Sequence, residues 1–393
     1  MKRTFGLLLL PFLAALPIAR AADSGPPPAS SAAGATVPAY FPAFSWDRVP
    51  VYQQFADGER VLTDAEAAEI ASTSGFICIE KNHAVKALGG AELGTKHEAT
   101  RFKALQPGLK CLFYFNSACA YPFVTASKVF QFGKVNDQHR PFLLTDPKTG
   151  ELARRGEVYY FDVLNPDFRQ WWASTVGQCV RESGADGLFV DQMHGFSFLR
   201  PERKREVAAA QAELMRMAKA AIGPDRILLL NNAAHLPELF EIGDAFMLEH
   251  YGAQLLTKEA IVNDWELLKR ISAAGKIAVW RIGVEVESRT PPPAAKQGQL
   301  SDAASEELSR KRLPFYLAAF LVGAQPYSYF QYGWGWRLKT GPLAAYPEFN
   351  RPLGRPRGES VPTAPGHWRF RREFEHARVQ VDLDARTGEI EWR

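Results

Sequence analysis

Two carboxylate residues, Asp191 and Glu249, stand where acid–base chemistry would be placed. Each follows a short apolar run, Gly187–Val190 before Asp191 and Ala245–Leu248 before Glu249. Short apolar runs bounded by glycine and polar residues are typical of parallel strands that are buried on both faces. In barrels of such strands, residues at the C-terminal strand ends carry the chemistry. Both carboxyl groups are therefore expected at the same edge of the sheet.

A pair of carboxyl groups flanking one bond is what glycoside hydrolysis requires, because one of them must protonate the leaving oxygen. The two groups lie ~5–5.5 Å apart in retaining enzymes and ~6.5–9.5 Å apart in inverting ones. Asp191, with its short side chain, suits the nucleophile. Glu249, beside His250 and Tyr251 after an apolar strand, suits the general acid/base. The alternative is that each carboxylate only makes structural hydrogen bonds.

Polar or aromatic residues also end most of the other apolar runs, which predicts a polar cleft. Glu80 is the second choice for a catalytic or substrate-binding carboxylate, whereas Asp186 in Asp-Gly is typical of a turn. Lys81 and Arg281 would bind an anionic sugar or form salt bridges. The residues expected to bond sugar hydroxyls are Asn116, Asn231, Asn232, His250, Arg281 and Gln331. The residues expected to stack on sugar rings are Tyr114, Tyr329 and Trp334.

Four histidines, at positions 83, 194, 235 and 250, raise the question of a metal. Zinc sites in hydrolases need three converging ligands, and the sequence has no His-x-His or His-x-x-x-His pair. We therefore expect structural or sugar-binding histidines and no cofactor. A metal-dependent hydrolase stays open as a third alternative.

Strand and helix patterns alternate along the chain and would position these residues. The predicted strands are 49–55, 75–80, 110–116, 187–190, 226–230, 245–248, 276–280 and 326–331. The main predicted helices are 64–72, 95–105, 166–182, 206–222, 257–274 and 303–322. Thr63 with Glu66, and Asn165 with Pro166, are helix-start signals. Eight such units predict an α/β fold, a (β/α)₈ TIM barrel. The rival is a doubly wound sheet, but its Gly-x-Gly-x-x-Gly fingerprint is absent after the first strand.

Composition divides the chain into four parts. Residues 1–21 have a basic start, an apolar centre and Ala19-Arg20-Ala21, which predicts a signal peptide cleaved near Ala21. Residues 22–38, rich in Pro, Ser, Ala and Gly, are interpreted as a disordered linker. The barrel is expected over 39–345. A small antiparallel β appendage is expected over 346–393, with Thr387-Gly388 as a turn.

Charge and cysteine usage narrow the expected partners and compartment. Removal of residues 1–21 takes away three basic residues and no acids, so the formal charge falls from +4 to +1. That balance gives no support to a nucleic-acid partner. We expect a monomer without a membrane span, located outside the cell or in the periplasm. Of the four cysteines, Cys78 and Cys111 are expected as buried thiols, and one disulfide is left open.

The chain resembles the hypothetical glycosyl-hydrolase-like family fifteen over roughly residues 40–393. The segments that carry the resemblance are Phe44-Ser-Trp-Asp, Tyr52, Phe76-Ile-Cys-Ile-Glu-Lys, Phe113-Tyr-Phe-Asn-Ser, Ala120-Tyr-Pro, Asp162 with Asn165-Pro166, Asp186-Gly-Leu-Phe-Val-Asp191, Pro352-Leu-Gly-x-Pro and Arg372-Glu-Phe-Glu. More distantly, the chain is similar to the α-retaining barrels related to α-galactosidases and α-glucosidases. That resemblance implies Asp191 as nucleophile and Glu249 as acid/base, with Glu where many of those relatives use Asp.

The sequence thus predicts a secreted or periplasmic glycoside hydrolase that acts on an oligo- or polysaccharide and retains the anomeric configuration. The alternative is a non-catalytic carbohydrate-binding protein on a glycosidase-like barrel, because fold alone does not dictate function.

Overall fold

The computed structural model describes residues 37–146, 149–193, 195–250, 252, 256–284, 302–333, 336, 338–364 and 366–393. Val37–Arg393 form one compact unit. The predicted signal peptide, most of the predicted linker, His194, Tyr251 and Trp334 lie outside the described residues.

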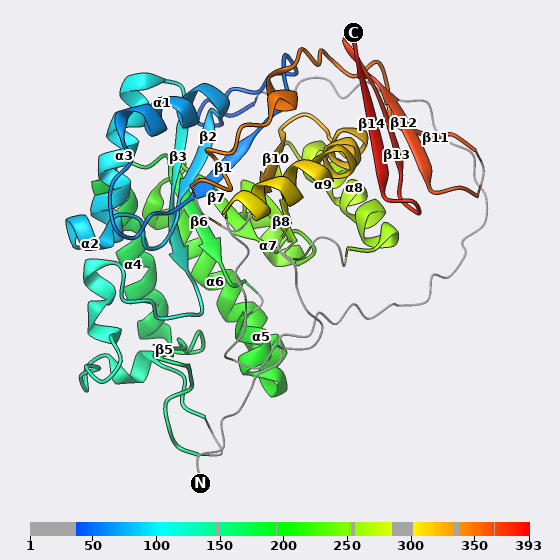
Figure 1. Ribbon diagram of the computed structural model, residues 1–393. Coiled ribbons are helices and arrows are strands. Elements are labelled where there is room, and N and C mark those ends of the chain that lie inside the picture. Colours follow the sequence, from blue (N-terminus) through cyan, green and yellow to red (C-terminus); the bar gives the residue numbers. More distant parts are fainter. Residues whose placement is uncertain are drawn as a thin grey trace. The chain divides into compact units, whose positions relative to one another are not determined.

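A parallel barrel of eight strands forms the centre of this unit (Figure 1). Its strands, in spatial order, are β1 (Tyr52–Phe55), β2 (Phe76–Ile79), β3 (Lys110–Asn116), β6 (Gly187–Asp191), β7 (Ile227–Asn231), β8 (Ala245–His250), β9 (Ile277–Gly283) and β10 (Ser328–Gly333). An isolated parallel bridge between Val51 and Phe330 joins the first strand to the last. The predicted (β/α)₈ barrel is confirmed.

Helices connect the strands and cover the barrel from outside. They are α1 (Asp64–Thr73), α2 (Val85–Leu88), α3 (Ala91–Leu105), α4 (Pro166–Ser183), α5 (Gly195–Leu199), α6 (Lys204–Ile222), α7 (Pro237–Ile242), α8 (Lys258–Ala273) and α9 (Asp302–Gly323). The sequence did not predict α2, α5 and α7, which are too short to show an amphipathic period. The excursion after β3 holds the short strands β4 (Arg154–Arg155) and β5 (Val158–Tyr159).

Two predicted helix starts are confirmed in atomic detail. At α1, the Glu66 amide donates to Thr63 Oγ1 at 3.2 Å and the Thr63 amide donates to the Glu66 carboxylate at 2.8 Å, which is a capping box. At α4, Asn165 Oδ1 accepts from the amides of Asp167 and Phe168 at 2.8 and 3.2 Å. These caps fix the start of each helix and therefore the length of the loop before it.

The barrel interior is set by strand alternation. One buried cluster takes side chains from all eight barrel strands, which identifies it as the inside: Tyr52, Phe76, Cys78, Leu112, Tyr114, Phe189, Ile227, Leu229, Ala245, Met247, Ile277, Val279 and Tyr329. Intervening residues such as Leu188, Val190 and Phe246 belong to a second cluster that faces the helices. Because side chains alternate between faces, the inward set continues two residues further along each strand.

Gly187 is required by packing at the start of β6. A Cβ atom there would lie 2.1 Å from the carbonyl oxygen of Ile227 and 2.8 Å from a Leu112 methyl group. Asp186, just before it, accepts a hydrogen bond from the Cys111 amide at 2.9 Å and lies 3.3 Å from Lys103 Nζ. Asp186 therefore ties β6 to β3 at the end of the barrel opposite Asp191.

The C-terminal segment forms a four-stranded antiparallel sheet against α9, visible in red beside α8 and α9 in Figure 1. Its strands are β11 (Val361–Pro362), β12 (Arg369–Glu373), β13 (Ala377–Asp382) and β14 (Thr387–Trp392). The buried guanidinium of Arg372 donates to the carbonyls of Leu321 and Ala324 at the end of α9, where the helix dipole favours a cation.

The predicted turn at Thr387-Gly388 is wrong. Both residues lie in β14, paired with Asp382 and Val381, and the turn is formed by residues 383–386. A Cβ at Gly388 would lie 2.4 Å from the carbonyl oxygen of Pro314. The glycine therefore permits close packing of the sheet on α9 rather than a change of chain direction.

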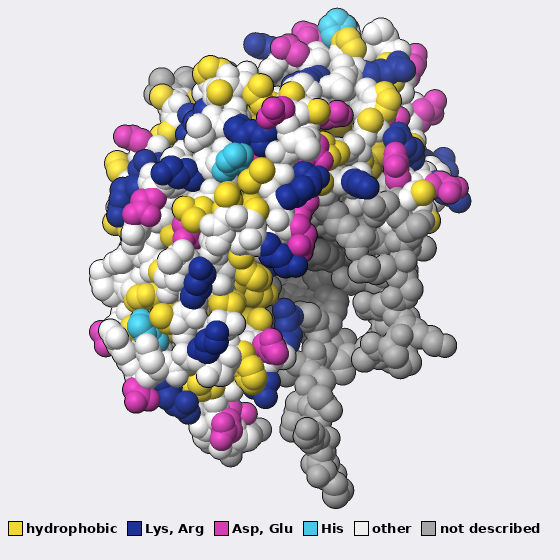
Figure 2. Space-filling model, turned by 60° about the vertical axis from the view of Figure 1, so that its left-hand side comes forward, with side chains coloured by type: hydrophobic (Ala, Val, Ile, Leu, Met, Phe, Trp, Pro, Cys, Tyr) yellow, Lys and Arg dark blue, Asp and Glu magenta, His cyan; other side chains and the backbone are white. Residues whose placement is uncertain are grey.

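Neither the face drawn in Figure 2 nor the four cysteine thiols marks a function. On the face drawn in Figure 2, basic and acidic side chains are interspersed. The four cysteines are all buried free thiols. Among the described residues, no helix combines the length and the apolar composition needed to cross a bilayer.

Candidate active site

Eight polar side chains, one from each barrel strand or the residue after it, line the C-terminal mouth of the barrel. They continue the inward alternation by one step, and we call them the polar rim: Gln54, Glu80, Asn116, Asp191, Asn231, Glu249, Arg281 and Gln331. Six of them are buried, with relative exposures of 1–5%. The other two, Asp191 and Glu249, are partly exposed. The rim thus opens to solvent at its two candidate catalytic carboxylates.

Asp191 accepts four hydrogen bonds. The Tyr114 hydroxyl and Asn116 Nδ2 donate to Oδ2, the latter at 3.2 Å. Asn231 Nδ2 and the Gln192 amide donate to Oδ1, at 3.0 and 2.6 Å. The four hydrogen bonds therefore fix the orientation of the carboxylate at the end of β6.

The Asn231 amide bridges the two carboxylates. Its Nδ2 donates to Asp191 Oδ1 at 3.0 Å and to Glu249 Oε2 at 2.6 Å. The distance between the two acceptor oxygens therefore cannot exceed the sum of these two hydrogen-bond lengths. Because the two N–H bonds of an amide diverge, the oxygens lie about 5 Å apart.

Left-handed backbone follows both β6 and β7. Gln192 has a φ of 62° and Asn232 a φ of 52°, and asparagine tolerates this region better than most residues. The Asn232 side chain accepts a hydrogen bond from the Glu249 amide at 2.9 Å. Asn232, predicted to bond a sugar, is thereby engaged in holding the backbone of Glu249.

Glu80 and Lys81 form an ion pair at one side of the rim. Glu80 Oε2 lies 2.8 Å from Lys81 Nζ, and Glu80 Oε1 accepts from Gln54 Nε2 at 2.7 Å. Burial works against the charged form of Lys81, but the charge and hydrogen bond of Glu80 outweigh it and raise the pKa of the lysine. Lys81 is therefore a permanent ammonium group whose first partner is a protein carboxylate.

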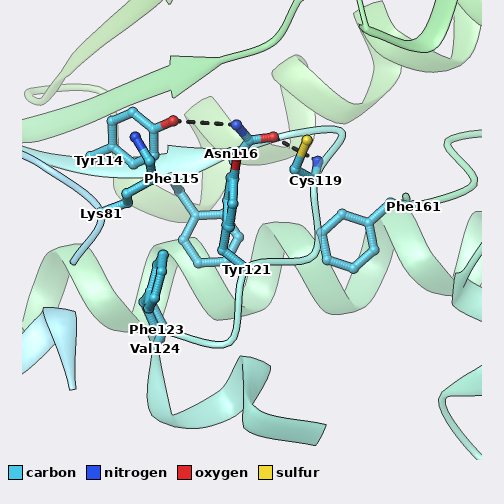
Figure 3. Close-up of a pocket in the computed structure, with 9 residues that line it drawn as sticks. All are labelled: Lys81, Tyr114, Phe115, Asn116, Cys119, Tyr121, Phe123, Val124 and Phe161. Carbon is cyan, nitrogen blue, oxygen red and sulfur yellow. Dashed lines mark hydrogen bonds between the residues drawn. The ribbon is translucent and has the colours of Figure 1, made fainter. Parts of the chain in front are cut away.

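A small hollow lies beside the end of β3 (Figure 3). Tyr114 and Asn116, which both donate to Asp191, are part of its lining, and Lys81 lies against the Tyr114 ring. The loop after β3 adds Tyr121 and Phe123, whose rings stack 5.6 Å apart and nearly parallel. These two aromatic residues were not predicted, because they lie in an irregular loop with no strand pattern.

Arg281 and Gln331 complete the rim on the far side. Arg281 is 1% exposed, donates to the His250 carbonyl at 3.1 Å and lies 4.6 Å from the centre of the Trp336 ring. Gln331 Nε2 contacts the Gln54 carbonyl at 3.4 Å. Among the described residues, neither Gln331 Oε1 nor Asn231 Oδ1, both buried acceptors, has a hydrogen-bond partner. Unpaired buried acceptors are costly, so both oxygens suit hydroxyl donors of a ligand.

Besides Asn232, two further residues predicted to bind sugar are not brought to the rim. His250 points away from the interior, and its Nε2 lies 2.6 Å from Asp264, which also accepts from Trp280. Tyr329 points inward but lies deeper, 5.3 Å from Phe76 and 5.7 Å from Phe44. Trp334 lies outside the described residues.

Gln54 was the rim residue that the sequence reading missed. The signal was present, because Gln54 lies two residues after the inward Tyr52. Its neighbour Gln53 has the same side-chain chemistry, so only the alternation of strand faces distinguishes the two.

In the described part of the chain, no group of three His, Cys, Asp or Glu side chains is arranged to hold a metal ion. His83, one of the histidines considered as a metal ligand, makes hydrogen bonds within the protein instead. Its Nδ1 accepts from the Asp57 amide at 3.0 Å, so its Nε2 carries the proton toward Glu98, 3.1 Å away.

Solved glycosidase structures match the chain at low identity and with TM-scores below 0.5. The glycoside hydrolase domain of PelA from Pseudomonas aeruginosa is 14% identical, with a TM-score of 0.42 over 67% of this chain and 89% of that one. Aspergillus fumigatus Ega3, solved with galactosamine, is 15% identical, with a TM-score of 0.40 over 69% and 89%. The α-galactosidase TtGalA from Thermus thermophilus, solved with stachyose, is 17% identical, with a TM-score of 0.44 over 78% and 64%.

The family assignment comes from the sequence itself. No curated protein sequence matches the chain significantly. Residues 103–378, which include β3 to β10 and the first two strands of the C-terminal sheet, match the profile of a single family. The chain belongs to hypothetical glycosyl hydrolase family 15 and is a glycoside hydrolase of that family.

Proposed function

We propose that this protein is a retaining glycoside hydrolase that cleaves an oligo- or polysaccharide outside the cytoplasm, with Asp191 as nucleophile and Glu249 as general acid/base. The observation that carries the proposal is the Asn231 bridge, which holds the two partly exposed rim carboxylates about 5 Å apart. A retaining enzyme needs this short spacing, whereas an inverting enzyme needs room for a water molecule between sugar and base.

The environments of the two carboxylates support different roles. Asp191 has a short side chain held by four hydrogen bonds, and such a fixed carboxylate suits attack on the anomeric carbon. Glu249 lies near the end of β8 at the partly exposed mouth of the barrel, where its longer side chain can reach the leaving oxygen. Two carboxyl groups in unlike surroundings can divide the acid and nucleophile roles between them.

The reaction proceeds in two displacements. An Asp191 oxygen bonds to the anomeric carbon while the glycosidic C–O bond breaks, and Glu249 gives its proton to the departing oxygen. Glu249, now a carboxylate, removes a proton from water. The resulting hydroxyl displaces Asp191 from the anomeric carbon, and the sugar leaves with its original configuration.

The remaining rim groups suit neutral hydroxyl-bearing sugars. Asn231 Oδ1 and Gln331 Oε1 provide acceptors for hydroxyl donors. Lys81 is already paired with Glu80, and Arg281 lies against the Trp336 ring, so neither presents an isolated cation to an acidic sugar. The signal peptide expected over residues 1–21 supports the secreted or periplasmic location.

A glycan screen tests this proposal. The protein is incubated with neutral, amino and acidic polysaccharides, and new reducing ends are measured. For any glycan cleaved, proton NMR of the first anomer released should show retention. First release of the inverted anomer would disprove the retaining mechanism, and full activity after chelation would remove the metal-dependent alternative.

The non-catalytic alternative gives a different result in the same screen. Binding of a glycan by calorimetry, with no reducing ends released after prolonged incubation, would favour a carbohydrate-binding protein and contradict the hydrolase.

A further inference from the structure

Lys81 is held in a defined position although it lies near the mouth of the barrel. Its Nζ lies 2.8 Å from Glu80 Oε2, and its backbone amide donates to the same oxygen at 3.2 Å. The Lys81 side chain retains 28% exposure, while that of Glu80 retains 3%. The buried carboxylate therefore fixes the lysine, rather than the reverse.

The ammonium group of Lys81 lies over aromatic faces. Nζ is 4.8 Å from the centre of the Tyr114 ring and 5.9 Å from that of Tyr121, and Figure 3 shows Lys81 beside the Tyr114 ring. At these distances the cation is attracted to the negative face of each ring. It also draws electron density from the Tyr114 ring, which makes the phenolic O–H a better hydrogen-bond donor.

The Tyr114 hydroxyl donates directly to the proposed nucleophile. Tyr114 is 2% exposed, stacks on Phe189 at 5.5 Å, and its oxygen accepts from Asn116 Nδ2 at 3.2 Å while it donates to Asp191 Oδ2. Burial, followed by the charge of Asp191, raises the pKa of Tyr114 well above its usual value. The phenol thus keeps its proton, and the direction of the hydrogen bond is fixed.

We propose that Lys81 is a positioning residue that acts on Asp191 through Tyr114. The cation over the Tyr114 ring strengthens the hydrogen bond from the phenol to Asp191, which holds the carboxylate in its attacking orientation. Lys81 therefore supports turnover without contacting the sugar. This inference rests on the proposed function of Asp191 as nucleophile.

A direct sugar contact is the competing role, and kinetics separate the two. With any glycan found in the screen, Lys81→Met should lower kcat about tenfold and leave KM within about threefold, because binding groups are intact. Lys81→Arg, which keeps a cation at the ring, should recover most of kcat. A large rise in KM with unchanged kcat would overturn the proposal.

A double-mutant cycle tests whether the effect passes through Tyr114. In a Tyr114→Phe background, which has no phenolic proton, Lys81→Met should cause little further loss of kcat. Lys103→Met is the matched control, because Lys103 pairs with Asp186 away from the rim. Equal loss from Lys81→Met in both backgrounds would show that Lys81 does not act through Tyr114.

A measurement without substrate keeps this inference separable from the enzymatic proposal. The hydroxyl proton of Tyr114 should give a downfield proton NMR resonance that disappears in Tyr114→Phe. It should move upfield in Lys81→Met and stay in place in Lys103→Met. An unmoved resonance in Lys81→Met would refute the coupling even if the enzyme is active. A moved resonance without activity on any glycan would support the coupling and count against the hydrolase.

Discussion

The two ends of the barrel interior differ in what the same strands place there. At the N-terminal end, Phe76 lies edge-on to Tyr52 and Tyr329, with ring centres 4.9 and 5.3 Å away. At the C-terminal end, further along the alternation, each inward position is polar, and Asn231 joins Asp191 to Glu249. Aromatic packing fills one end, and a hydrogen-bond network lines the other.

Inward side chains at the N-terminal end of the barrel therefore contribute mainly to stability, whereas those at the C-terminal end are available for chemistry. Packed rings exclude water and gain dispersion energy, but they offer a ligand nothing to bond. The polar rim contains buried acceptors that lack partners and carboxylates held close together, and both features cost stability unless a function requires them. Substitutions at the two ends should therefore affect different measurements.

The largest effect is expected for Asp191→Asn. This change keeps the side-chain shape but removes the nucleophilic charge, so kcat should fall by about 10³-fold or more. Asp186→Asn is the matched control, since Asp186 bonds the Cys111 amide at the other end of β6. It should reduce stability by about 1–2 kcal/mol and leave kcat unchanged. Near wild-type kcat in Asp191→Asn would show that Asp191 is not the nucleophile.

At the N-terminal end, Phe76→Ala should lower stability instead. Phe76 is fully buried between two rings, and truncation of such a residue costs about 3–5 kcal/mol. Denaturant unfolding measures the loss, while kcat per folded molecule should stay near that of the wild type. A proportionate fall in kcat at temperatures where the variant is fully folded would contradict the separation of the two ends.

Asn231→Ala tests the connection inside the rim. Without the bridging amide, no donor lies between the Asp191 and Glu249 carboxyl groups, which are about 5 Å apart. The carboxylates should then lose their fixed spacing, and kcat should fall by about 10- to 100-fold. Unfolding free energy should change little, because the lost bonds involve partly exposed acids. An unchanged kcat would mean that the bridge does not set the productive geometry.

Much of the fold could be predicted from sequence because the relevant signals are local. The strand Lys110–Asn116 has the bounds that the sequence predicts. The strand predicted over residues 187–190 is one residue longer, because Asp191 pairs with Asn116 of β3. Glu249 and His250 show the limit of reading strand ends alone. They are adjacent in β8 but face opposite sides of the strand. Glu249 belongs to the inward series with Ala245 and Met247, but this series can be recognised only when it is known which face of the strand points into the barrel.

The bridge itself could not be predicted from the sequence. Asn231 contacts both carboxylates because β7 lies between β6 and β8, which depends on strand order rather than on any local pattern. The difference between Tyr114 and Tyr329 could not be predicted for the same reason. Both point inward one step below the rim, yet only Tyr114 lies close enough for its hydroxyl to reach Asp191.

The smallest effects come from removing those two hydroxyl groups in turn. Tyr114→Phe deletes one of four donors to Asp191, so kcat should fall about tenfold. Tyr329→Phe deletes a hydroxyl whose contact is the Ala43 carbonyl at 3.5 Å, so kcat should stay within about twofold and stability within about 0.5 kcal/mol. Steady-state kinetics on both variants measure the contrast. The two tyrosines share burial, orientation and chemistry and differ in whether the hydroxyl reaches Asp191. Equal losses of kcat would therefore mean that contact with Asp191 does not decide function.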